Sequence, residues 1–349
     1  MTGSTTTTAL IVAEHGGPDR LTVAERTVPA PGPGEVQVRV AAAGVNFIDV
    51  YQRQGIYPIP TPFVLGLEGA GEVVAIGPPT PAAAPFQSDP ADLGGPGSDA
   101  VPLQCGDQVA WAMCLGSAAG LANFPAAQLV PVPAGLDVTL AAAAMLQGMT
   151  AHFLVNTTYA VRPGERVLVH AAAGGVGQLL IQMLVAKGAE VIATAGSPQK
   201  LAIAEQLGAR SLIDYSATPD VAAQVRTLTG GRGVDVVYDG VGKATFDGSL
   251  ASLRPRGMLV LFGAASGPVP PFDLQRLNQG GSLFVTRPSL GHHVSTRAEL
   301  LEHARAVLTE LAAGRLHVAI GGRWPLAEAA AAYAHLEGRG STGKLLLLP

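Results

Sequence analysis

The chain has 349 residues, enough for about two domains that each bury a hydrophobic core. Hydrophobic residues make up 48% of it, charged residues only 14%, and the net charge is -4, which argues against a disordered chain and against a nucleic-acid-binding surface. The two cysteines, Cys105 and Cys114, are typical of reduced intracellular thiols rather than of a disulfide framework. The first residues lack the basic and apolar regions of a signal peptide, so we expect a cytoplasmic location.

The first third of the chain predicts a mostly β domain. From Ala9 to about Pro133, short β-rich runs are separated by Pro, Gly and Asp, as in a sandwich or a partly open barrel. One interruption, Pro78 to Leu103, has no periodicity and is rich in Pro, Ala, Gly and Asp. This composition predicts a surface loop or a mobile insertion, with or without a function of its own.

After about Leu136, apolar helices give way to strict alternation of strand and helix. This alternation predicts a doubly wound, six-stranded parallel sheet. Two amphipathic helices and a final apolar strand follow the sixth strand, and we expect them to return to the first domain. The six predicted strands are Arg166 to His170, Glu190 to Thr194, Ser211 to Asp214, Val234 to Tyr238, Met258 to Phe262 and Ser282 to Val285.

The first of these strands runs into the small-residue turn of LVHAAAGGVG, and a helix, QLLIQMLVA, follows. Such a corner places free backbone N–H groups at a helix N-terminus, where a dinucleotide pyrophosphate binds. The stretch Val167 to Ala186 is about as long as a membrane span, but its glycines and the following Lys187 suit a buried strand, turn and helix better. The dinucleotide fingerprint matches at two glycines, with alanine in place of the first, and predicts contacts from Ala172, Gly174, Gly175, Val176 and Gly177.

The end of the second strand indicates which nucleotide binds. NAD sites commonly carry an acidic residue here for the ribose hydroxyls, but this chain has Ala195 and Gly196. A carboxylate would repel a 2'-phosphate, so its absence, together with Ser197 and Lys200, favours NADPH. Ser197 before a proline is also an ordinary helix N-cap, and Lys200 could be a solvated helix lysine.

Five stretches together resemble a known family: GVNFIDVYQRQGIYP, HAAAGGVGQLLIQ, VDVVYDGVG, LNQGGSLFVTRPSL and STGKLLLLP. The chain resembles quinone oxidoreductases of the zeta-crystallin type, in the zinc-independent branch of the medium-chain dehydrogenase/reductase superfamily. The resemblance implies a GroES-like catalytic domain in residues 1–146 and 289–349 and a Rossmann domain in residues 147–288. It also implies a cleft between the domains for NADPH, and a homodimer.

The same resemblance marks the site residues. It places Asn46, Asp49 and Tyr51 at the nicotinamide end, and Lys200 and Tyr215 at the adenosine 2'-phosphate. The other cofactor contacts that it implies are Thr150, Phe262, Gly263, Val285, Arg287 and Arg339.

Several of these positions have structural alternatives. Tyr215 could be a buried strand-end tyrosine, Arg339 a helix-terminal charge, and Arg287 a residue that fixes the domain crossover. Tyr51 could form an aromatic wall, and Asp49 could cap the turn that presents Tyr51. We interpret His170, at the end of the first strand of the sheet, as a packed strand-end residue rather than a catalyst.

The resemblance also shows where zinc relatives carry their ligands. Those positions hold Asn46, Leu67 and Gln147 here, and Glu68 alone does not hold zinc, so we predict no metal site. A quinone needs less polarisation than an alcohol, because incoming electrons delocalise over its ring oxygens. Tyr51 is then the candidate proton donor, and Asn46 would orient the carboxamide or the acceptor carbonyl.

The sequence therefore predicts an NADPH-dependent quinone reductase. An NADPH-dependent reductase of enone or alkenal double bonds would use the same cleft. A non-catalytic NADPH sensor or a nucleic-acid-binding protein is the third possibility, although the acidic balance makes nucleic acid an unfavourable partner.

Overall fold

The computed structural model describes residues 4–79, 103–338 and 340–349. The predicted insertion from Pro78 to Leu103 lies almost wholly outside the described residues, and so does Arg339. The chain divides into two compact units. The first unit comprises Met1–Met149 and His293–Pro349, and the second unit comprises Thr150–His292. The predicted boundaries, at residues 147 and 288, lie within a few residues of these.

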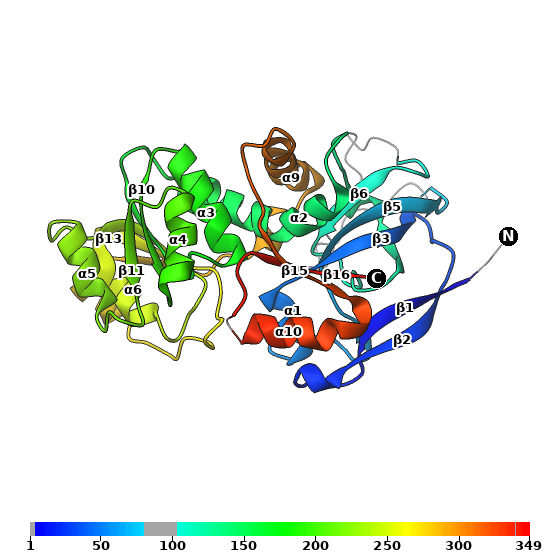
Figure 1. Ribbon diagram of the computed structural model, residues 1–349, viewed down its shortest axis with the longest axis horizontal. Coiled ribbons are helices and arrows are strands. Elements are labelled where there is room, and N and C mark those ends of the chain that lie inside the picture. The colour runs from blue at the N-terminus through cyan, green and yellow to red at the C-terminus, as the bar shows by residue number, and fades with distance from the viewer. Residues whose placement is uncertain (1–3, 80–102, 339) are drawn as a thin grey trace. The chain divides into compact units, whose positions relative to one another are not determined.

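The second unit is the predicted six-stranded parallel sheet with its helices (Figure 1). The strand order β11-β10-β9-β12-β13-β14 places the first strand in the middle, with the chain winding outward in both directions. The strands are β9 (Arg166–Val169), β10 (Glu190–Ala195), β11 (Ser211–Asp214), β12 (Val234–Asp239), β13 (Leu253–Leu261) and β14 (Phe284–Thr286). The helices are α3 (Gly175–Ala186), α4 (Pro198–Gln206), α5 (Val221–Leu228), α6 (Phe246–Ser252) and α7 (Gln275–Gln279).

Strand alternation decides which side chains form the core of this unit. Leu168, Ile192 and Val237 come from three neighbouring strands and share a buried cluster with Val225 of α5 and Leu250 of α6. Successive strand residues point to opposite faces, so one face of the sheet is buried under α5 and α6. The same packing aligns the carboxyl ends of the strands at one edge, where doubly wound sheets bind their ligands.

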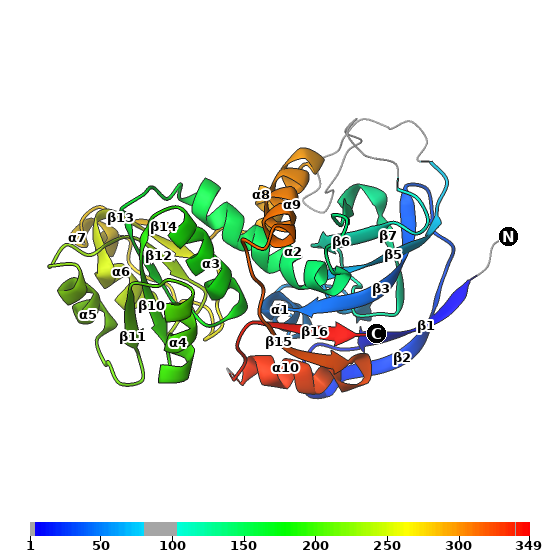
Figure 2. The same ribbon diagram turned by 45° about the horizontal axis from the view of Figure 1, so that its top comes forward.

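The first unit is mostly β, as predicted (Figure 2). One sheet has the order β15-β16-β3-β5-β6-β8, with β7 also paired to β3, and a smaller sheet has the order β2-β1-β4. Its strands are β1 (Thr5–Val12), β2 (Leu21–Val28), β3 (Glu35–Val45), β4 (Phe63–Val64), β5 (Glu68–Ile76), β6 (Gln108–Ala112), β7 (Leu121–Pro125), β8 (Val130–Pro131), β15 (Ile320–Pro325) and β16 (Lys344–Leu348). The helices α1 (Phe47–Arg53), α9 (Arg297–Ala312) and α10 (Ala329–Glu337) belong to this unit, α2 (Val138–Phe153) lies mostly in it, and α8 (Leu290–His293) ends at its boundary.

The C-terminal segment belongs to the first unit. Strand β16 pairs antiparallel with β3, so that Leu345 lies opposite Val45 and Leu347 opposite Ala43. Helix α10 covers this pairing through Tyr333, which is buried in the same hydrophobic cluster. The last residues of the chain therefore complete the sheet that begins near residue 35.

Some elements were not predicted. Strands β4, β7 and β15 were missed because their sequences, such as LANFP, do not alternate and include or border proline. The two predicted apolar helices after Leu136 are one helix, α2, which continues into a wider helical turn over Leu154–Thr158. Among the described residues, Val138–Thr158 is the helix that is long and apolar enough to cross a membrane, and 61% of its most apolar window is buried inside the protein. Such burial is typical of a core helix.

Candidate active site

The turn after β9 leads directly into a helix and is tightly packed. Helix α3 begins at Gly175, and Gly174 is its extended N-cap. A Cβ atom on Gly177 would overlap the carbonyl oxygens of Ala171 and Ala172, so only glycine allows this packing. The first N–H groups of α3 have no acceptor within the helix and are available to an anion. The predicted residues from Ala172 to Gly177 thus form one continuous segment, the turn after β9 and the start of α3, at the carboxyl edge of the sheet.

The end of β10 gathers the residues predicted for the 2'-phosphate. Ser197 caps α4 by accepting the backbone N–H of Lys200 at 3.3 Å, which confirms its N-cap role. Tyr215 is 51% exposed and therefore is not a buried strand-end tyrosine. Its ring lies against Gly196, where a Cβ atom would meet the hydroxyl oxygen at 2.6 Å. Ser197, half-buried Lys200 and Tyr215 thus lie around a strand end that carries no acid of its own.

One carboxylate near this strand end was overlooked in the sequence. Asp214 lies opposite Ala195 in the β10–β11 register. Its Oδ1 accepts the backbone N–H of Ser216 at 2.8 Å and the Ser216 hydroxyl at 2.6 Å, and the hydroxyl contact above all lowers the pKa of Asp214. The carboxylate therefore stabilises the turn that follows β11. The serine two residues later, in the sequence DYS, could have indicated this role.

The remaining predicted contacts of the second unit lie at the ends of β13 and β14. A Cβ atom on Gly240 would meet the Phe262 ring at 2.9 Å, and one on Gly263 would overlap Gly240 itself, so these segments pack with no side chain between them. Val285 pairs with Leu259. Exposed Arg287 donates to the carbonyl oxygen of Leu261 at 3.1 Å and so ties the ends of the two strands together. Half-buried Thr150 begins the unit within α2.

A buried polar network supports this carboxyl edge. His170 is 4% exposed, and its ring contacts the hydroxyl of Thr194 at 2.9 Å and that of Ser249 at 3.1 Å. Ser249 also donates to Asp239 at 2.7 Å. Burial lowers the pKa of His170, so its neutral ring links β9, β10 and α6. The packed role predicted for this histidine agrees with these contacts.

In the first unit, the predicted residue Asn46 belongs to a fully buried charged cluster. The Lys344 ammonium forms an ion pair with Glu68, and both side chains are 0% exposed. Lys344 also donates to Asn46 Oδ1 at 2.7 Å, while Asn46 Nδ2 donates to Glu68 Oε2 at 2.8 Å. The backbone N–H of Leu146 donates to Glu68 Oε1 at 2.7 Å. Gly44 is required beside this cluster, because a Cβ atom there would overlap the Glu68 carboxylate.

Asp49 lies one helical turn from this cluster, at the start of α1. Its Oδ2 accepts the backbone N–H of Asn46 at 2.8 Å and the hydroxyl of Tyr333 at 3.0 Å. Complete burial raises the pKa of Asp49 to about 7, against the lowering effect of these hydrogen bonds. The contact with Asn46 is the capping role that the sequence left open for Asp49.

Tyr51 lies at the centre of an aromatic group on α1 and the segment after it. Its ring meets that of Tyr57 edge-on at 5.4 Å between centroids and that of Phe47 at 6.4 Å. Tyr51 and Phe47 are half-buried, and Tyr57 is 41% exposed. Both alternatives for Tyr51, an aromatic wall and a hydroxyl donor, are compatible with this position.

The residues at the zinc positions of relatives do not suit zinc. Gln147 donates to Asn46 Oδ1 at 3.3 Å, and Leu67 is buried next to Glu68 in the chain. Neither an amide pair nor a leucine provides the thiolate and imidazole ligands that zinc prefers, and the Lys344 ammonium would repel a divalent cation. Among the described residues, no group of three or more His, Cys, Asp or Glu could hold a metal ion.

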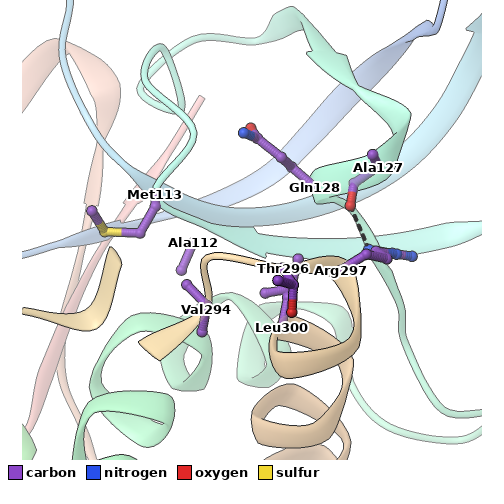
Figure 3. A pocket seen from close by; sticks show the side chains of 8 residues that line it. All are labelled: Ala112, Met113, Ala127, Gln128, Val294, Thr296, Arg297 and Leu300. Carbon is purple, nitrogen blue, oxygen red and sulfur yellow. Dashed lines mark hydrogen bonds between the residues drawn. The ribbon is translucent and has the colours of Figure 1, made fainter. Parts of the chain in front are cut away.

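A separate small pocket of the first unit contains none of the predicted site residues (Figure 3). Arg297, at the start of α9, donates to the carbonyl oxygen of Ala127 at 2.8 Å, and both residues line the pocket. Burial lowers the pKa of Arg297. The side chains that line the pocket are Ala112, Met113, Ala127, Gln128, Val294, Thr296, Arg297 and Leu300.

Two family models match the chain. The alcohol dehydrogenase GroES-like domain matches residues 32–134, and the zinc-binding dehydrogenase model matches residues 175–304. The second model takes its name from the zinc-binding members, whose ligand set this chain lacks at the positions described above.

Individual relatives match over nearly the full length. The quinone oxidoreductase of Pseudomonas aeruginosa is 43% identical over 97% of this chain and 98% of its own. A 2-haloacrylate reductase from Burkholderia is 40% identical, with 98% of each chain covered. The crystal structure of Escherichia coli quinone oxidoreductase complexed with NADPH is 38% identical, covers 98% of this chain and 100% of its own, and superposes with a TM-score of 0.89. The chain therefore belongs to the quinone oxidoreductases of the medium-chain dehydrogenase/reductase superfamily.

Proposed function

We propose that this chain is an NADPH-dependent quinone reductase of the zeta-crystallin type that works without a metal. The buried Glu68–Lys344 pair carries the proposal, because its cation contacts Asn46, the position at which the resemblance implies a zinc ligand in relatives. A quinone needs no metal ion to accept hydride, since the charge spreads over its ring oxygens. The quinone oxidoreductases that match this chain over 97% and 98% of its length support the same activity.

The second unit provides the residues that would hold NADPH. The turn from Ala172 to Gly177 receives the pyrophosphate, and Ser197, Lys200 and Tyr215 receive the 2'-phosphate. When bound, NADPH supplies the hydride, and the net reaction adds that hydride and one proton to the quinone. Phe262, Gly263, Val285 and Arg287 border the cofactor at the ends of β13 and β14, and Thr150 and Arg339 are further proposed contacts.

The first unit provides the acceptor side of the reaction. Tyr51, with Phe47 and Tyr57, offers aromatic faces on which a flat quinone ring can stack, and the Tyr51 hydroxyl is the proposed proton donor. Asn46 already uses its amide groups within the buried cluster, and Asp49 caps α1. These contacts favour a positioning role for Asn46 and Asp49 over direct contact with the acceptor.

The substrate class is tested by comparing 1,4-benzoquinone with a simple enone, with NADPH as the reductant. We expect kcat/KM for the quinone to exceed that for the enone at least tenfold. Equal or faster enone reduction would instead establish the alternative, a double-bond reductase, which the haloacrylate reductase relative favours. Tight NADPH binding without turnover of any acceptor would support the third possibility, a nucleotide sensor. The net charge of -4 weighs against nucleic acid as its partner.

We also propose a homodimer that forms along β14. This strand is the edge of the six-stranded sheet, and on its outer side it pairs with no other strand of the described chain. Phe284 on this strand is 56% exposed, and Leu274, just before α7, is 70% exposed. An apolar, open strand edge is a surface that pairs readily with a second copy.

A cytoplasmic location is the remaining proposal. Cys105, which is exposed, and Cys114, which is buried, are both free thiols. Unpaired cysteines are typical of a reducing compartment.

A further inference from the structure

The buried ammonium of Lys344 determines which way the Asn46 amide faces. A lysine ammonium has donors and no acceptor, so the Asn46 atom that it contacts must be the oxygen. The nitrogen then faces Glu68 Oε2 at 2.8 Å and the carbonyl oxygen of Gly44 at 3.3 Å, which are both acceptors. Turning the amide over would oppose donor to donor and acceptor to acceptor, so its orientation is set by the charges around it.

The orientation of the Asn46 amide in turn determines the orientation of the Gln147 amide. Since Asn46 presents its oxygen, Gln147 must present its amide nitrogen, and the two atoms lie 3.3 Å apart. The other polar atom of the Gln147 amide is Oε1. This oxygen is buried and has no hydrogen-bond partner in the described part of the chain. An acceptor that is shut off from water without a partner costs about 1–3 kcal/mol.

We infer that Gln147 Oε1 is a ligand-binding acceptor that takes a hydrogen bond from an N–H or O–H group of a bound reactant, and that Lys344 is the positioning residue that orients it through Asn46. This inference rests on the proposed function, which supplies two sources of such a donor. One is the carboxamide N–H₂ of the nicotinamide, and the other is the O–H of the hydroquinone that forms. Both groups can donate a hydrogen bond to an amide oxygen.

The variant Gln147→Met tests this role, because methionine has a similar volume and no strong acceptor. Its dissociation constants are measured by fluorescence titration with NADPH and with the reduced 3-acetylpyridine analogue, whose methyl ketone has no N–H. If the carboxamide N–H₂ is the donor, Gln147→Met should bind NADPH about tenfold more weakly and bind the analogue as the wild type does. If the hydroquinone O–H is the donor, the variant should bind NADPH and the analogue as the wild type does, and its kcat/KM for benzoquinone should be about tenfold lower.

The matched control is Gln37→Met on β3. Gln37 is also buried, but its Nε2 donates to protein oxygens, those of Pro29 and Asn123. If Gln147→Met changes neither the dissociation constants nor kcat/KM more than Gln37→Met does, the inference is overturned. Gln147→Asn withdraws the oxygen by one methylene and serves as the second variant if the methionine does not fold. A wild-type protein that reduces no quinone would contradict the proposed function instead, while the NADPH titration would still test Gln147.

The role of Lys344 needs a variant that removes both charges together, because a lone buried Glu68 would be strongly destabilising. In Lys344→Met/Glu68→Gln, no cation orients the Asn46 amide. Adding Gln147→Met to this double variant should therefore change the affected quantity, the NADPH dissociation constant or kcat/KM for benzoquinone, by less than threefold. In the wild type the same substitution should change it about tenfold. The same tenfold cost in both backgrounds would refute the positioning role, since a purely structural Lys344 would leave the Gln147 effect unchanged.

Discussion

We expect the choice of NADPH over NADH to depend on Lys200. It is half-buried in the first turn of α4, which follows a strand end without an acid. A hydrogen bond to a charged phosphate contributes about 1.5–3 kcal/mol, which corresponds to roughly tenfold or more in affinity. We therefore expect Lys200→Ala to raise KM for NADPH at least tenfold and to leave KM for NADH nearly unchanged.

The matched control for Lys200 is Gln206→Ala, which shortens an exposed polar side chain at the other end of α4. Steady-state kinetics with both dinucleotides should give wild-type KM values for this variant. An unchanged NADPH preference in Lys200→Ala would identify Lys200 as a solvated helix lysine.

Asp49 should make the stability of the protein depend on pH. Its pKa is raised by burial from 3.8 to about 7, so between these values the folded chain holds a proton that the unfolded chain has lost. The stabilisation is complete below pH 3.8 and is lost as the pH rises through 7. From pH 5 to pH 8 the free energy of unfolding should fall by about 3 kcal/mol from this group, at about 1.4 kcal/mol for each unit below the folded pKa.

Urea unfolding at pH 5 and pH 8 measures this fall. The neutral variant Asp49→Asn should lack it, and an equal fall in the variant would contradict the raised pKa. Asp137→Asn is the control. The Thr139 hydroxyl holds the pKa of Asp137 below its usual value, so this carboxylate stays ionised in both states over that pH range.

At the scale of one element, the turn between β9 and α3 depends on the absence of a side chain at Gly177. In Gly177→Ala the new Cβ atom would overlap two backbone carbonyl oxygens, so the turn must shift. We expect NADPH affinity to fall about tenfold or more, because the N–H groups of α3 would no longer converge on the pyrophosphate. Isothermal titration calorimetry measures the loss.

Gly248, within α6, provides the comparison for that glycine. A Cβ atom there meets nothing within 4 Å. Since alanine is the better helix former by about 1 kcal/mol, Gly248→Ala should keep NADPH affinity and raise the melting temperature. Equal affinities in the two variants would show that the tight turn is not needed for binding.

At the scale of the whole molecule, the open edge at β14 predicts the oligomeric state. Phe284→Lys places a charge on the exposed apolar strand and should convert a dimer to a monomer, as measured by size-exclusion chromatography with light scattering. Ile76→Lys, on β5 of the first unit, replaces an apolar side chain that is 47% exposed and should remain dimeric. A monomeric wild type would refute the dimer.

Much of the second unit could be predicted because its signals are local. The strand β9, the glycine turn and α3 are consecutive in the chain, and each is specified by its own hydrophobic period and backbone requirements. The absence of an acidic residue at Ala195 can likewise be seen within one segment. The exposure of Tyr215 could not be predicted in this way, because it depends on how β11 ends beside Gly196.

The family, the sheet of the second unit and the turn between β9 and α3 follow from sequence patterns alone. The contacts around Asn46 do not, because they depend on distant parts of the chain. Lys344 is 298 residues from Asn46, and Tyr333 is 284 residues from Asp49. The pairing of β16 with β3 and the packing of α10 bring these groups together. The hydrophobic pattern of one segment does not indicate which charged residue from a distant segment will contact it. In the sequence, Lys344 is only the first residue of a final strand. In the folded protein it is the cation that orients the polar groups of the candidate active site.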